Sequence, residues 1–81
     1  MPVVKVLVLL PWRRYEENIA RYTLDNIWCF TATWAEIEEE GWEAYIFKGE
    51  NLHSSTKHWF SEKDAMRFLE MEAHNRGFYL L

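Results

Sequence analysis

The chain has 81 residues and a net charge of −4; 49% of its residues are hydrophobic and 17% are aromatic, with five tryptophans among them. This composition excludes an intrinsically disordered chain and predicts a single domain over residues 1–81 that folds without metal or disulfide crosslinks. The sign of the charge argues against nucleic acid as a partner, because non-specific phosphate binding requires a basic excess.

The sequence contains one cysteine, Cys29, which cannot close a disulfide within the chain. A single cysteine outside any metal-binding spacing favours a reducing compartment, so we expect a cytoplasmic protein. The apolar run Val3–Leu10 is interrupted by Lys5 and is far shorter than the roughly 20 residues that span a bilayer. We therefore expect no contact with a membrane.

The first predicted element is a strand over Val3–Leu10, because a continuous aliphatic and β-branched run is typical of a strand covered on both faces. Such a strand would be central in its sheet. Pro11 ends it. Residues 13–24 then allow two interpretations: aromatic side chains at spacings of three and four favour an amphipathic helix, whereas alternation from Asn18 to Leu24 would make a strand. We prefer the helix.

Two segments rich in aromatic and β-branched residues, Ile27–Glu38 and Trp42–Lys48, predict a β-hairpin. The alternative is a short helix over Trp34–Glu40, since Thr33 followed by Glu36 fits a capping box. We prefer the hairpin, because that helix would carry four glutamates and have little to bury.

The C-terminal part predicts a polar loop after Gly49, a short strand over Thr56–Phe60 and then a helix. Ser61 is its expected N-cap, and Gly77 its end. An apolar stripe marks the buried side of this helix, formed by Ala65, Phe68, Leu69 and Ala73. The last segment, Phe78–Leu81, predicts a final strand.

The predicted order is therefore βαββαβ, which is the order of ferredoxin-like folds. We expect an α+β protein with a four-stranded antiparallel sheet and two helices on one face.

Motifs for catalysis or metal binding are weak. His53 and His58 are five residues apart, which places them on opposite faces of a strand, and no further ligand stands at metal-binding spacing. Ser54 and Ser55 lie in no nucleophile motif, and Cys29 between two aromatic residues is typical of core packing. We expect no catalytic residue, no metal site and no cofactor.

A stronger signal comes from the hairpin when Glu39 and Glu40 form a two-residue turn, which pairs Glu36 with Glu43. Small and aliphatic residues then form one face, a suitable bed for the helices. The other face is aromatic with an acidic tip, and two helices on one side would leave it uncovered. A shift of register by one residue would exchange these faces and put the aromatic residues in the core. The candidate binding surface comprises Trp28, Phe30, Trp34, Glu36, Glu43, Tyr45 and Phe47.

These patterns predict a non-enzymatic protein-binding module, a small regulator or inhibitor of the kind that a phage or mobile element encodes. A protein partner or a second copy of the chain, forming a homodimer, would cover the aromatic face, and Glu36, Glu38 and Glu43 would attract basic groups.

Two alternatives use the same sheet. The first is single-stranded nucleic-acid binding by base stacking, which the acidic rim disfavours. The second is a dimeric ligand binder or enzyme with an intersubunit pocket, in which His53 or His58 would act as acid or base.

Overall fold

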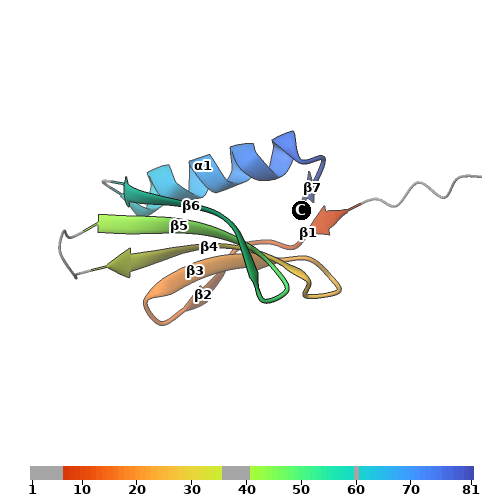
Figure 1. The fold of residues 1–81 in the computed structure, drawn as a ribbon, viewed down its shortest axis with the longest axis horizontal. Coiled ribbons are helices and arrows are strands. Elements are labelled where there is room, and N and C mark those ends of the chain that lie inside the picture. Colours follow the sequence, from red (N-terminus) through yellow and green to blue (C-terminus); the bar gives the residue numbers. More distant parts are fainter. Residues whose placement is uncertain (1–6, 36–40, 60) are drawn as a thin grey trace, which may run out of the picture.

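The computed structural model describes residues 7–35, 41–59 and 61–81. Five antiparallel strands form a meander in chain order, with α1 along one side of it (Figure 1). These strands are β2 (Arg13–Tyr15), β3 (Asn18–Tyr22), β4 (Trp28–Ala35), β5 (Gly41–Lys48) and β6 (Asn51–Trp59). The helix is α1 (Glu62–Asn75), and a separate parallel pair consists of β1 (Val8–Leu9) and β7 (Tyr79–Leu80).

The ferredoxin-like prediction is wrong. The described chain contains one helix, a five-stranded antiparallel sheet and a two-stranded parallel sheet, instead of two helices on a four-stranded sheet. The two errors lie in the N-terminal half. Residues 13–24 are not a helix, and β1 is not a central strand but pairs with β7 at the end of the molecule.

Residues 13–24 contain a β-hairpin, whose second strand, Asn18–Tyr22, lies in the segment that the alternative interpretation made a strand. Tyr15 pairs with Asn18 across a two-residue turn, in which Glu16 has a left-handed backbone with φ 47°. Alternation follows in β3, where Ile19 lies on the side of the helix and Ala20 on the opposite side. The spacing of aromatic residues was misleading because this turn lacks the glycine or asparagine that normally marks a tight hairpin.

The predicted hairpin of β4 and β5 is confirmed, but its register differs from the prediction. Glu43 pairs with Thr33 instead of Glu36, and the last described pair is Ala35 with Gly41. The rival helix is wrong for Trp34 and Ala35, which belong to β4. The expected turn at Glu39 and Glu40 lies outside the described residues.

The core lies between the sheet and α1. Phe30 and Ile46 are a cross-strand pair with no exposed surface, and beside them Ala32 pairs with Ala44. The two alanines leave room for the helix to approach the sheet closely, and its buried side consists of Ala65, Leu69 and Ala73. Even-numbered residues of β4 and β5 therefore form the helix face of the sheet.

The prediction of α1 is confirmed at both ends. The Ser61 hydroxyl oxygen accepts a hydrogen bond from the Asp64 backbone N–H at 3.1 Å, which satisfies a free donor of the first turn. At the other end Gly77 adopts φ 85°, and the Phe78 N–H reaches back to the Ala73 carbonyl at 3.0 Å. The chain then turns into β7, which confirms the final strand.

Arg21 in β3 links the segments around β1 and β7 to the sheet. Its side chain is 4% exposed and points to the helix face. The guanidinium donates to the backbone oxygens of Leu10 at 2.7 Å, Leu81 at 2.7 Å and Leu9 at 3.4 Å. We call Arg21, Glu70 and Trp12 together the Arg21 cluster.

The other members of the Arg21 cluster are Glu70 and Trp12. Arg21 Nη1 lies 3.5 Å from Glu70 Oε1, which also accepts a hydrogen bond from Trp12 Nε1 at 2.7 Å. The guanidinium carbon lies 5.5 Å from the centre of the Trp12 ring. Burial lowers the pKa of Arg21 and the Glu70 charge partly restores it, but an arginine stays charged in proteins.

Replacing Arg21 with Met should lower the free energy of unfolding by about 3 kcal/mol, because it removes the guanidinium donors from the Leu10 and Leu81 backbone oxygens and leaves Glu70 without its cation. Urea unfolding followed by circular dichroism measures this loss. Arg67→Met, on the exposed side of α1, is the matched control and should change stability by less than about 0.5 kcal/mol. Equal stabilities of the two variants would contradict the role given to Arg21.

Candidate functional site

The sheet has one face that no described helix covers. This open face follows from the strand pairings, which alternate side chains between the helix side and the opposite side. Its members are Arg13 and Tyr15 of β2, Asn18, Ala20 and Tyr22 of β3, Cys29, Thr31 and Thr33 of β4, Glu43, Tyr45 and Phe47 of β5, and Leu52 of β6.

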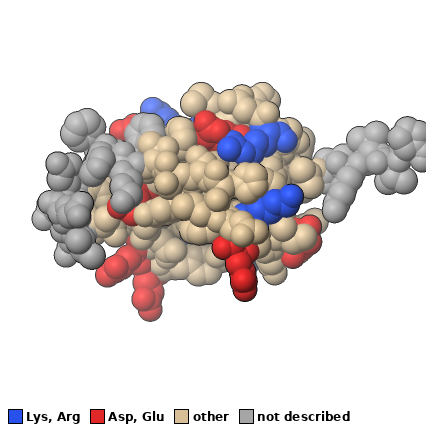
Figure 2. Space-filling view, viewed as in Figure 1, with Lys and Arg blue, Asp and Glu red and all other residues tan. Residues whose placement is uncertain are grey.

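Polarity changes along the strands of the open face. At one end Thr33 pairs with Asn18 and Glu43, beside the turn that carries Glu16 and Glu17. We call this end, which carries Glu16, Glu17 and Glu43, the acidic end. Figure 2 shows acidic side chains projecting along the lower margin of the view, both on this side and toward the other end of the sheet.

The opposite end of the open face is apolar. There Cys29 pairs with Tyr22 on one side and with Phe47 on the other, and Phe47 pairs in turn with Leu52. Leu52 is 54% exposed, and Ile27 close to this end is 44% exposed. We call this the apolar end. Because one end of the open face is charged and the other is apolar, a partner would bind it in one orientation.

Hydroxyl groups on the open face have partners within the protein. The Tyr45 hydroxyl donates to the Glu43 carboxylate two residues earlier, and the Tyr45 ring stacks on Phe47 with centroids 5.9 Å apart. The Thr31 hydroxyl donates to the Ile19 carbonyl at 3.1 Å. These contacts hold the side chains in defined positions, so that the face is ordered before anything binds to it.

Tyr22 and Cys29 form a second pair on this face. A hydrogen bond between their side chains and partial burial raise the pKa of Tyr22 to about 12. Burial raises the pKa of the Cys29 thiol, which the bond to Tyr22 only partly offsets. The thiol therefore stays protonated near neutral pH and is a poor nucleophile.

The structure divides the predicted binding residues between the two faces. Trp28, Phe30 and Trp34 lie on the helix face, and Phe30 has no exposed surface. Glu43, Tyr45 and Phe47 lie together on the open face, and Glu36 lies outside the described residues. The altered register explains this division.

Tyr15 and Tyr22 of the open face were missed because their segment was predicted to be helical. Their rings meet edge to face at 6.1 Å. Alternation within β3 was the sequence signal that could have identified them.

Of the two predicted histidines, the structure describes the side chain of His53, which lies against an aromatic ring. The His53 ring lies 4.9 Å from Trp28, whose ring also faces the Lys48 ammonium at 5.5 Å. The side chain of His58 lies outside the described part of the chain. Among the described residues, no three His, Cys, Asp or Glu side chains gather closely enough to hold a metal ion.

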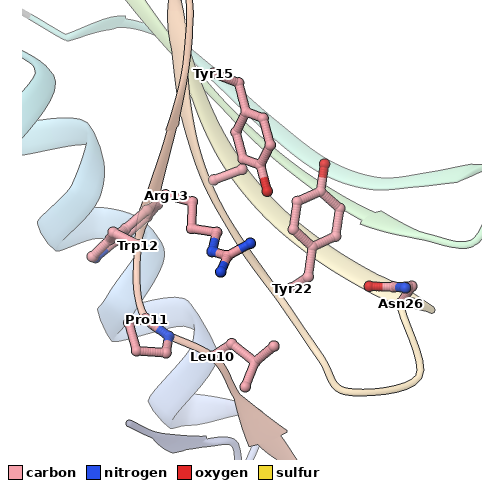
Figure 3. Close-up of a pocket in the computed structure, with 8 residues that line it drawn as sticks. Leu10, Pro11, Trp12, Arg13, Tyr15, Tyr22 and Asn26 are labelled. Atoms are coloured by element: carbon pink, nitrogen blue, oxygen red, sulfur yellow. The ribbon is translucent and has the colours of Figure 1, made fainter.

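A hollow of about 430 Å³ lies at the β2 edge of the open face, where Arg13, Tyr15 and Tyr22 belong to both (Figure 3). Arg13 and Tyr15 of β2 and Tyr22 of β3 direct their side chains toward it, and Leu10 closes its lower side. Asn26, in the turn between β3 and β4, lies at the far side.

Comparisons with protein-family models, with curated proteins and with solved structures give no match for this chain. Within the described ranges, no helix is both long and apolar enough to cross a bilayer.

The tyrosine contacts predict a late step in an alkaline titration. The pKa values of Tyr22 and Tyr45 are raised to about 12 from an ordinary 10.0, the latter mainly by the hydrogen bond to Glu43. The unfolded chain releases these protons first, so both groups stabilise the fold below pH 10 and lose that contribution as the pH rises toward 12.

Tyrosinate absorbance measured against pH should therefore show a component near 12, and Tyr22→Phe and Tyr45→Phe should each remove part of it. Tyr79→Phe, at an exposed position in β7, is the control and should leave this component unchanged. A late component that survives the combined Tyr22→Phe and Tyr45→Phe changes would contradict the two hydrogen bonds.

Proposed function

We propose that the protein is a non-enzymatic binding module whose open face docks on another protein, as a small regulator or inhibitor does. The observation that carries the proposal is the uncovered side of a five-stranded sheet, with Tyr22, Tyr45, Phe47 and Leu52 on its surface. Aromatic residues with few rotatable bonds supply large contact areas at low entropic cost, which is why interfaces favour them.

The charge and polarity of the open face indicate what kind of partner surface would fit it. The acidic end, with Glu16, Glu17 and Glu43, would attract lysine or arginine side chains, and the apolar end would pack on an apolar patch. We therefore propose a partner that carries an apolar centre with basic residues on one side.

A second copy of the chain fits this face less well. A two-fold axis along the strands would place the acidic end of one copy on the acidic end of the other. An axis in the plane of the face and perpendicular to the strands would place the glutamates of one copy on Phe47 and Leu52 of the other. Both arrangements bring charges against like charges or against apolar groups, which disfavours self-association through the open face.

Nucleic acid is also a poor occupant, because carboxylates at the acidic end would repel phosphate groups. We propose a cytoplasmic location on the evidence of the single cysteine, whose thiol is partly buried and unpaired.

The test compares the wild-type chain with a Tyr45→Ser/Phe47→Ser variant. Each protein is immobilised and exposed to cell lysate, and a captured protein is identified, purified and titrated. We expect the variant to bind this purified partner at least about thirtyfold more weakly, because two central aromatic anchors are lost. Binding by the wild type should also weaken as salt is raised.

The matched control is Met71→Ser/Tyr79→Ser, which removes two large exposed side chains outside the open face and should bind like the wild type. Circular dichroism must show that all variants fold. Equal binding by the face variant and the control would overturn the proposal. A stable dimer that the face variant abolishes, or an oligonucleotide that binds the face, would do the same.

A further inference from the structure

The hollow at β2 is lined by one arginine, two tyrosines, an asparagine and apolar residues. The geometry points to a site for a carboxylate attached to an apolar body about the size of an amino acid. This inference goes beyond protein docking on the open face and does not depend on it. It rests on the charge, the lining and the size of the hollow.

The charge of the hollow is set by Arg13. Its neighbour Arg14 pairs with Glu62 on α1, and Arg21 pairs with Glu70. Among the described residues, no carboxylate pairs with Arg13, whose guanidinium points into the hollow (Figure 3). In a chain with a net charge of −4, this leaves an accessible cation without an acidic residue in the lining around it.

The remaining polar groups can complete an anion site. The Tyr15 hydroxyl supplies a donor beside Arg13, and the Asn26 side-chain amide lies across the hollow from them. The Tyr22 hydroxyl is hydrogen-bonded to Cys29, so Tyr22 presents its ring, which meets the Tyr15 ring at 6.1 Å. The Arg13 and Tyr15 donors thus lie at the β2 side of the hollow, and the Tyr22 ring faces them.

Apolar residues form the rest of the lining. Leu10, Pro11 and Ala20 border the hollow, whereas the Trp12 indole turns away to bond Glu70 on the helix. The backbone here is fixed, because the Leu10 N–H donates to the Tyr22 carbonyl at 2.9 Å. The volume of about 430 Å³ lies in the usual range for sites that hold a small organic group.

A carboxylate suits this lining better than a phosphate. A guanidinium binds both oxygens of a carboxylate through two parallel N–H donors. A phosphate dianion would call for further positive charge, but the lining contains no lysine and no helix N-terminus. The nearby Glu16 and Glu17 would also repel a doubly charged group more strongly than a single charge.

The test uses phenylacetate as the probe and phenylacetamide as its neutral counterpart, titrated into isotope-labelled protein. We expect saturable shifts of the backbone amide signals of Leu10, Arg13, Tyr22 and Asn26, and binding of phenylacetate at least about tenfold tighter than that of the amide. Arg13→Gln should reduce phenylacetate affinity about tenfold and remove its advantage over the amide.

Arg67→Gln, at an exposed position on α1, is the matched control and should bind both probes like the wild type. The folded state of each variant is checked from its amide spectrum. Absence of saturable shifts, equal affinity for the two probes, or equal weakening by the Arg13 and Arg67 changes would overturn the site.

The same chemistry could come from a free acid or from the end of a peptide chain. A second arm therefore titrates acetyl-glycyl-phenylalanine, whose carboxylate is free. Tighter binding of phenylacetate would support the site with a free acid as its ligand, and tighter binding of the peptide would support it with a chain terminus. The Tyr45→Ser/Phe47→Ser variant should bind both probes normally, which separates this site from docking on the open face.

Discussion

The Arg21 guanidinium is the interaction on which the arrangement of the chain depends. The sheet itself is a local meander, in which each strand pairs with its neighbour in sequence. The β1–β7 pair must be held at one end of this sheet and α1 along its face. Backbone oxygens on Leu9, Leu10 and Leu81 all accept hydrogen bonds from this one side chain, and Glu70 balances its charge. A buried cation is costly unless each donor finds a partner, so these segments are confined to one arrangement.

The C-terminal helix could be predicted from the sequence because its signals are local, whereas residues 51–55, predicted as a polar loop, belong to β6. Ser61, Gly77 and the stripe of small apolar residues define α1 through contacts within a few turns. Residues 13–24 have no such signals. Tyr15, Ile19 and Tyr22 stand at spacings that suit a helix, yet in the hairpin Ile19 lies on the opposite side of the sheet from the two tyrosines. The hairpin prevails over the helix because β3 pairs with β4 and Arg21 is buried. Neither contact can be read from the spacing of residues in the sequence.

The residues predicted to share one face of the sheet are divided between its two faces, those of β5 on the open face and those of β4 on the helix face. Placing the turn at the wrong pair of residues shifted the pairing by an odd number of positions, which exchanges the faces of one strand relative to its partner. The register found here brings Ala32 opposite Ala44, directly beneath Ala65, Leu69 and Ala73. Small side chains at Ala32 and Ala44 allow α1 to pack closely on the sheet. The predicted surface therefore kept Tyr45 and Phe47 but lost the tryptophans to the helix side.

The composition of the open face reconciles exposure with binding. A face of aliphatic side chains would tend to aggregate, whereas Tyr22, Tyr45 and Thr31 place hydroxyl groups among the rings and methyl groups. Each hydroxyl already has a partner in the free protein, so docking need not leave a donor buried without an acceptor. The ordered side chains also lose little freedom on binding. Arg13 stands at the margin of this face and points into the hollow (Figure 3). Arg13 and Tyr15 lie on one side of the edge strand β2, so this strand contributes to both the open face and the hollow. Arg14, on the other side of β2, pairs with Glu62 of α1.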